Sequence, residues 1–203
     1  DFLARSFRRA GREDPDLGID AGAQTVLDRT ACLFTDEGVE LRFTVSLPAA
    51  GRKILGHKAR DLLCGRLPEA VAAAAEADRL DLEHLERHCA AVEDQVALRE
   101  ALANRGLVAF VGEGAVLPRR SGVDDRPLQQ AIPFGVPDSL RVTLETPNAG
   151  AVTGLGIPHG ITLIVGGGFH GKSTLLSALE TGIYDHVPGD GRHQIATDPT
   201  AVK

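Results

Sequence analysis

Nine consecutive residues, GGGFHGKST, combine the residue types that can hold a polyphosphate. Glycines allow the backbone to curl so that successive N–H groups point inward and form an anion-binding nest at a helix N-terminus. The ammonium group of Lys172 can reach the β- and γ-phosphates, and the Ser173 hydroxyl can coordinate Mg²⁺. Thr174 offers a further hydroxyl to the α-phosphate. The pattern Gly-x-x-x-x-Gly-Lys-Ser predicts a Walker A loop, which consists of Gly166, Gly167, Gly168, Phe169, His170, Gly171, Lys172, Ser173 and Thr174.

The segments on both sides of this loop are the ones that a phosphate loop requires. The apolar run ITLIV (161–165) predicts a buried strand, and LLSALETG predicts a helix with Gly182 as its C-cap. A glycine turn that contains Gly-Lys-Ser by chance is the alternative, and it needs neither element. The context favours a site for ATP and Mg²⁺, in which Lys172 is the catalytic group that stabilises charge on the phosphates.

Composition indicates a globular protein, with 43% hydrophobic and 25% charged residues in 203. The net charge of −6 argues against a generally basic surface that coats nucleic acid. Three scattered cysteines without a C-x-x-C pair favour a reducing compartment. No apolar run approaches the roughly 20 residues that span a bilayer, and no signal peptide is visible. We expect a cytoplasmic protein without a membrane partner, and the absence of Met indicates a piece of a longer chain.

The first 65 residues show short helix and strand patterns. A helical pattern begins at Phe2, and the segments CLF and VELRFTVSL flank a turn at residues 35–38, which predicts a hairpin. Apolar residues in the segment 54–63 then repeat with helical period, and Gly65 is expected to end that helix.

A long helix follows this region. Pro68 suits the first turn of an alanine-rich helix, and Asp81 can cap a second, amphipathic helix that ends near residues 104–106. LVAFV (107–111) predicts a buried strand. The loop-like segment 117–137 then suggests a boundary.

Beyond this segment we expect a strand at LRVTLE, a glycine-rich connection at PNAGAVTGLGIPHG, and the buried strand ITLIV. We therefore predict an α/β protein with a mixed α+β domain at residues 1–136. The start of a P-loop domain occupies residues 137–203.

The segments LRVTLETPNAG and GITLIVGGGFHGKSTLLSALETGIY together resemble the opening of an ABC-class ATPase domain. LPAAGRKILGHKA, GLVAFVGEGAVLPRRSGVDDRPL and GGGFHGKSTLLSALETGIYDHVPGDGR are similar to the family of predicted ABC-class ATPases. A kinetoplastid mitochondrial RNA-editing accessory protein is a relative of that family. The similarity covers nearly the whole chain. Phe169 and His170 depart from ABC transporters, which usually have a glycine and a small residue there, but match the predicted-ATPase family.

This resemblance implies a soluble homodimer that sandwiches two ATP molecules, with a P-loop fold of the ABC type. It also implies a Walker B aspartate, a catalytic glutamate, a signature loop and a switch histidine. None of these follows Ser173 in this sequence, and the family pattern places them beyond Lys203. We expect an ATPase as the full-length protein and little hydrolysis by these 203 residues alone.

Weaker patterns leave two interpretations open. Arg119, Arg120 and Arg126 have guanidinium groups that match phosphate or nucleic acid, but a solvated turn with local ion pairs explains them as well. His84 and His88, beside Cys89, have a metal-ligand spacing without a third or fourth ligand, and a pair of surface histidines is the simpler interpretation.

The roles of the aromatic and charged residues near the loop also remain open to two interpretations. Tyr184, His186 and the turn PGDGR (188–192) could touch the nucleotide or order the next strand, and a simple turn is the alternative. Phe134 is the one nearby aromatic that could stack on adenine, and core packing is its alternative role.

The sequence thus predicts a Mg-ATP-binding part of an ABC-class ATPase, with RNA or DNA handling as the driven process by analogy alone. A P-loop kinase for a small molecule is one rival, although such kinases usually carry the loop near their N-terminus. A non-enzymatic, nucleotide-gated nucleic-acid-binding module is the other.

Overall fold

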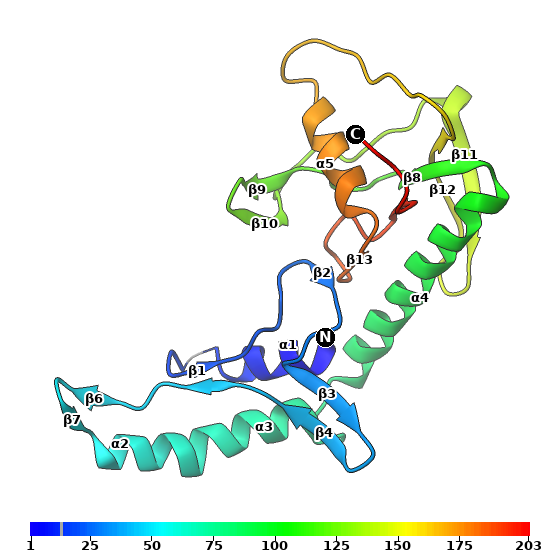
Figure 1. Ribbon diagram of the computed structural model, residues 1–203. Coiled ribbons are helices and arrows are strands. Elements are labelled where there is room, and N and C mark those ends of the chain that lie inside the picture. The colour runs from blue at the N-terminus through cyan, green and yellow to red at the C-terminus, as the bar shows by residue number, and fades with distance from the viewer. Residues whose placement is uncertain (13) are drawn as a thin grey trace. The chain divides into compact units, whose positions relative to one another are not determined.

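The computed structural model describes residues 1–12 and 14–203 (Figure 1). It contains two compact units, Asp1–Ala23 with Leu27–Leu85, and Gln24–Val26 with Glu86–Lys203. The sequence predicts a boundary at residues 136/137, whereas the compact units divide at residues 85/86. The two divisions differ because a buried strand at Leu107–Gly112 pairs with a strand that follows residue 137.

The first unit consists of short helices and two-stranded ribbons. Its elements are α1 (Phe2–Ala10), β1 (Leu17–Gly18), β3 (Cys32–Thr35), β4 (Gly38–Leu41), β5 (Thr44–Val45), β6 (Ala49–Ala50), β7 (Lys53–Ile54), α2 (Gly56–Asp61), the π-helix η1 (Leu62–Arg66) and α3 (Leu67–Ala75). Phe7 of α1 packs against Ala70 and Ala74 of α3, and its ring stacks on Phe43 with centroids 5.1 Å apart. This apolar cluster is the core of the unit.

Two predictions for this unit meet different outcomes. The predicted hairpin is confirmed, since β3 and β4 pair antiparallel from Cys32↔Leu41 to Thr35↔Gly38. The prediction that Gly65 ends a helix is wrong, because α2 continues through η1 into α3. A single glycine costs a helix only about 1 kcal/mol, which the packing of the α3 face against α1 offsets.

The second unit carries the larger sheet. Its elements are β2 (Thr25–Val26), α4 (Leu82–Asn104, from Glu86 onward), β8 (Leu107–Gly112), β9 (Arg119–Ser121), β10 (Asp124–Pro127), the 3₁₀ helix η2 (Asp138–Leu140), β11 (Arg141–Thr146), β12 (Gly150–Pro158), α5 (Lys172–Thr181), β13 (Asp185–His186) and β14 (Ile195–Thr197). β11, β12, β8 and β14 form an antiparallel sheet in that order. β13 pairs with β2, and β10 pairs with β9.

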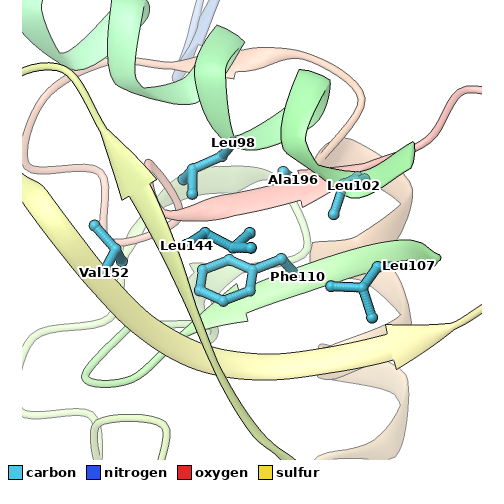
Figure 2. Packing of buried hydrophobic residues seen from close by; sticks show 7 residues of the cluster. All are labelled: Leu98, Leu102, Leu107, Phe110, Leu144, Val152 and Ala196. Carbon is cyan, nitrogen blue, oxygen red and sulfur yellow. The ribbon is translucent and has the colours of Figure 1, made fainter. Parts of the chain in front are cut away.

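Successive residues of β8 and β14 point to opposite faces of this sheet, and each face receives one helix. Phe110 and Ala196 belong to a cluster with Leu98 and Leu102 of α4, as Figure 2 shows. The neighbouring residues Val111 and Ile195 belong to a second cluster, with Ala178 of α5. The sheet therefore lies between α4 on one face and α5 on the other.

The N-terminal capping of α4 follows the sequence prediction. The backbone N–H of His84 donates to Asp81 Oδ1 at 3.0 Å, which satisfies one of the free donors of the first turn. The predicted helix 81–104, the buried strand 107–111 and the strand LRVTLE are all confirmed by α4, β8 and β11.

The prediction of a buried strand at ITLIV is wrong. Residues 161–165 have no strand assignment, and the side chains of Ile161, Leu163 and Val165 are largely exposed. Within the described part of the chain no strand pairs with this run, and extended backbone becomes sheet only where a neighbour satisfies its hydrogen bonds. The adjacent segment PNAGAVTGLGIPHG, expected as a connection, instead supplies β12 because β11 and β8 bond to it on both sides.

Candidate functional site

The predicted Walker A loop curls into the N-terminus of α5. Gly171 is the N-cap residue in a left-handed conformation (φ 78°), and α5 begins at Lys172. Phe169 also has a left-handed backbone (φ 61°), although its side chain is fully exposed. Left-handed residues reverse the chain direction within a few residues, and the first N–H groups of a helix have no intrahelical acceptor. The loop therefore turns sharply before α5 and leads to a helix start with free N–H groups.

The side chain of Lys172 folds back over this loop. Its Nζ donates to the carbonyl oxygen of Gly167. The His170 ring lies over the same backbone, so that a Cβ on Gly167 would come within 3.2 Å of ring atom Cε1. Glycine at position 167 therefore lets the His170 ring lie close to the backbone. The Lys172 ammonium group lies against the backbone of the same loop, where it could neutralise a bound anion.

The two hydroxyl residues after Lys172 line a hollow of about 520 Å³. Ser173 and Thr174 line its end nearest the phosphate loop, and Ser177 and Thr181 continue the same face of α5. Spacings of three and four residues place these hydroxyls on one side of a helix. Across from them lies the hairpin of β9 and β10 with its tip at residues 121–123.

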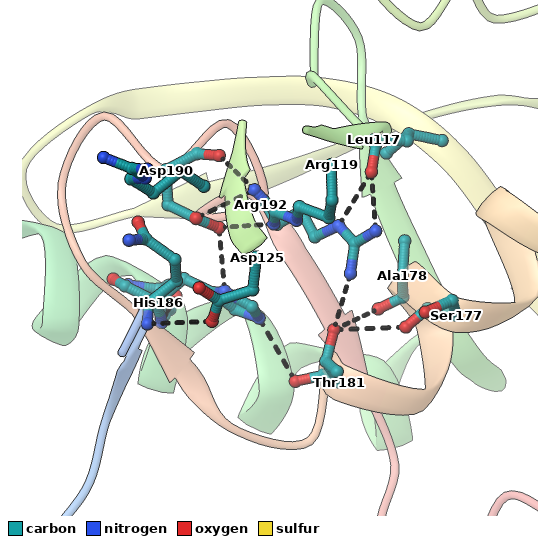
Figure 3. Close-up of polar contacts among 12 residues, drawn as sticks. Leu117, Arg119, Asp125, Ser177, Ala178, Thr181, His186, Asp190 and Arg192 are labelled. Carbon is teal, nitrogen blue, oxygen red and sulfur yellow. Dashed lines mark hydrogen bonds and ion pairs between the residues drawn. The ribbon is translucent and has the colours of Figure 1, made fainter. Parts of the chain in front are cut away.

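Three of the residues that line the hollow, Arg119, His186 and Arg192, belong to a cluster of polar contacts (Figure 3). Arg119 of β9 donates to both carboxylate oxygens of Asp190, at 2.9 and 2.7 Å, and His186 Nδ1 lies 2.8 Å from Asp190 Oδ2. Asp190 is 1% exposed and His186 is 2% exposed. The bidentate pair therefore links the hairpin to the turn that follows β13.

A second buried guanidinium links α5 to the chain before the hairpin. Arg192 donates from Nε and Nη2 to the carbonyl oxygen of Leu117, at 3.1 and 2.6 Å, and from Nη1 to Thr181 Oγ1 at 3.2 Å. These acceptors are neutral, and the nearby carboxylates of Asp190 and Asp125 add a favourable charge interaction that opposes the cost of burial. On the other side, the Gln95 side chain of α4 exchanges two hydrogen bonds with the backbone of His186.

Burial and neighbouring charges shift three pKa values in this cluster. Burial acts to raise the pKa of Asp190, but hydrogen bonds from His186 and Arg119 outweigh it, and the pKa lies below the ordinary value. Burial, together with the charge of Arg119, lowers the pKa of Arg192 to about 10. Burial also lowers the pKa of His193. The cluster therefore keeps the Asp190 carboxylate charged against the guanidinium of Arg119.

The structure separates the three arginines that the sequence analysis grouped. Arg119 belongs to the buried cluster, and Arg126 makes the expected local ion pair with Asp124, at 2.5 Å on the surface. Arg120 is exposed. Phe134, the candidate for adenine stacking, packs against the cluster around Val111 and so takes its alternative role.

Sequence reasoning missed the ion cluster. For His186 and the turn 188–192, the sequence left open contact with the nucleotide, ordering of the next strand or a simple turn. The partners Arg119 and Asp190 are 71 residues apart, and the only local signal was an aspartate between two glycines of a turn next to a buried strand.

Other expectations concern metals and membranes. Among residues 1–12 and 14–203, no group of three or more His, Cys, Asp and Glu side chains is arranged to hold a metal ion. His84 contacts the ring of Phe2, with centroids 5.4 Å apart, and His88 is buried, so the pair does not lie together on the surface. Within the same residues, no helix has the length and apolarity to cross a membrane.

Comparison with known proteins gives matches to two family models. Residues 81–203 match the P-loop domain of the ABC ATPase family, and residues 1–78 match the N-terminal domain described as "ATPase of the ABC class". The uncharacterized protein MJ1628 of Methanocaldococcus jannaschii is 35% identical over 119 residues, which cover 54% of this chain and 26% of that protein. The chain thus spans about a quarter of the length of this relative.

Proposed function

This chain belongs to the family of ABC-class ATPases, and from that membership we propose that it binds Mg-ATP at residues 166–174. A P-loop domain of this class binds a nucleotide. The observation that carries the finer assignment is the position of Lys172, whose ammonium group bonds to the carbonyl of Gly167 inside a loop with left-handed residues. Nucleotide phosphates are the ligand that such a lysine-bearing nest fits.

Each residue has a distinct part in this proposal. The backbone N–H groups of residues 166–171 hold the phosphate oxygens, and Lys172 stabilises the charge on the β- and γ-phosphates. Ser173 Oγ would hold Mg²⁺, and its exposed position leaves room for the ion. Bound Mg²⁺ supplies further charge neutralisation. Thr174 contacts the α-phosphate.

We extend the proposal to the full-length protein, because the match to this chain covers only 26% of the relative. There we infer ATP hydrolysis by a cytoplasmic homodimer that acts on RNA or DNA, on the basis of family membership. The rivals are a kinase for a small molecule, which would consume ATP only with its acceptor, and a nucleic-acid-binding module whose binding does not depend on the nucleotide.

Calorimetric titration of the chain with Mg-ATP tests the binding site. Lys172→Ala should weaken binding by about 10- to 100-fold, because a charge-assisted contact contributes about 1.5–3 kcal/mol. Lys203→Ala is the matched control, since that exposed lysine pairs with Glu180 instead. Equal affinity of Lys172→Ala and the wild type would refute the assignment. Binding of RNA that is the same in Lys172→Ala and with or without ATP would favour the non-enzymatic module.

A further inference from the structure

The first unit carries a strongly basic segment that has no part in the phosphate loop. Residues 41–60 contain no Asp or Glu, although the whole chain has 28 of them in 203 residues. Within this stretch, residues 52–60, here called the basic segment, carry four exposed cationic side chains, Arg52, Lys53, Lys58 and Arg60. We propose that the basic segment is a surface that binds the phosphate backbone of a nucleic acid. This inference rests on the proposed function, because it assigns the RNA or DNA of that proposal to a definite surface.

Short local elements present the four cations to solvent. Gly51 has a left-handed backbone (φ 58°), which closes the tight turn between the paired strands β6 and β7. Arg52 lies in this turn, and Lys53 is the first residue of β7. Lys58 and Arg60 belong to α2, the next element, and Figure 1 shows β6, β7 and α2 together at one end of the first unit. The cations therefore follow one another along a turn, a strand and a helix.

The charges of the basic segment are not compensated inside the described part of the chain. None of its four cationic side chains forms an ion pair there, whereas the exposed Arg42 nearby pairs with Glu40. The first carboxylate after the segment, Asp61, lies 3.4 Å from Arg66 Nε and so has a cationic neighbour of its own. Like charges that lie close together repel one another, and an anionic partner removes that repulsion.

The arrangement of these charges favours a nucleic acid over other anions. A small anion needs groups that converge on one point, whereas these four are spread over successive elements. A nucleic acid carries a negative charge at every nucleotide, and its phosphates require only exposed cations. The centres of protein interfaces are poor in charged residues, and lysine is depleted there. A lipid surface takes up the apolar side of a helix, but Ala59 of α2 and Leu62 directly after it are buried in the unit.

Fluorescence anisotropy of the whole chain with a short, labelled oligouridylate tests this surface. If each of the four cations neutralises one phosphate, the logarithm of the affinity falls with the logarithm of the salt concentration with a slope of about −2.8. The affinity then drops about 50-fold between about 50 and 200 mM KCl. In Arg52→Gln/Lys53→Gln the slope should be about −1.4 and the drop about sevenfold. These two residues are the cleaner pair to change, because Lys58 also lines a recess that contains Asp14 and Asp16.

Arg105→Gln/Arg120→Gln is the matched control. Both arginines are exposed in the second unit, and their replacement removes the same net charge from the chain. We expect this variant to keep the salt slope of the wild type. Equal loss of slope in the two double variants, or a loss in Arg105→Gln/Arg120→Gln alone, would overturn the assignment. Circular dichroism checks the fold of each variant.

The possible outcomes separate this surface from the function on which it rests. A loss of slope confined to Arg52→Gln/Lys53→Gln, with unchanged affinity for Mg-ATP, supports the inference. A wild type that binds Mg-ATP but no oligouridylate would overturn the inference and leave the phosphate loop in place. Polyglutamate and vesicles that contain phosphatidylserine stand for an acidic protein and a lipid surface. Tighter binding to either of these than to oligouridylate would also overturn it.

Discussion

The replacement Asp190→Asn tests whether the buried ion cluster stabilises the second unit. The substitution keeps the size of the side chain but removes its charge. It also replaces one acceptor oxygen by an NH₂ group, which then faces a donor of Arg119 at a site where the oxygen was 2.7 Å away. Arg119 and His186 therefore lose their common anionic partner.

The expected cost is about 3 kcal/mol of the free energy of unfolding. Removal of one partner of a buried ion pair costs roughly 3–5 kcal/mol, because the other charge is left uncompensated. The Asp190 side chain is 0% exposed, but that of Arg119 is 12% exposed, and water can reach part of the guanidinium. We therefore expect the lower end of this range.

Urea unfolding followed by circular dichroism measures the change, and amide hydrogen exchange at Val111 reports the opening of the sheet in this unit. Asp124→Asn is the matched control, because Asp124 forms an Arg–carboxylate pair with Arg126 on the surface of the same hairpin. We expect the control to unfold as the wild type does. If Asp190→Asn is no less stable than Asp124→Asn, the cluster does not stabilise the unit in the way described.

The Asp190 carboxylate also predicts that the stability of the fold depends on pH. The pKa of Asp190 is lower in the folded chain than in the unfolded chain. Its contribution is therefore complete above the ordinary carboxyl pKa of about 3.9 and disappears as the pH falls through the folded value. In Asp190→Asn this part of the acid sensitivity should be absent.

Three further changes give independent tests. Burial lowers the pKa of His193, so the folded chain binds fewer protons than the unfolded chain as the pH falls below about 6.5. The fold therefore loses stability in this range, and His193→Gln should reduce that loss between about pH 7 and pH 5 in urea titrations. Gly191→Ala should cost about 1–3 kcal/mol more than Gly189→Ala in thermal unfolding. Both glycines have positive φ (82° and 79°), but a Cβ at Gly191 would lie 2.6 Å from Val116 Cβ, while one at Gly189 would meet no described atom within 4 Å. If the two alanine variants lose the same stability, the clash at Gly191 is excluded. Phe169→Gly should keep Mg-ATP binding, while Phe169→Val should weaken it about tenfold, because a β-branched residue resists the left-handed φ of 61°. Tighter Mg-ATP binding by Phe169→Val than by Phe169→Gly in calorimetry would contradict this.

The elements that the sequence predicted well are those specified by neighbouring residues. Asp81 and the apolar period after it predict α4, and the pattern of glycines before Lys172 predicts the curl and the start of α5. Capping, helical period and left-handed glycines act over a few residues, so they can be found in one segment of sequence.

Two failures show where this local information ends. The run ITLIV has the composition of a strand, but its backbone finds no pairing partner among the described residues and stays outside the sheet. The segment after residue 149 is rich in glycine, yet it forms β12, in which a Cβ at Gly154 would meet the Val111 carbonyl at 2.4 Å. Strand formation depends on the neighbouring strand, which a local pattern does not contain.

The sequence by itself thus determined the family and the helices that flank the sheet, because contiguous residues carry those signals. The tertiary structure alone decided that Arg119 meets Asp190, that Arg192 meets Leu117 and Thr181, and that a hollow lies between α5 and the hairpin. The Arg119–Asp190 and Arg192–Leu117 contacts join residues 71 and 75 positions apart, and packing on both faces of the β8 sheet brings them within hydrogen-bonding distance.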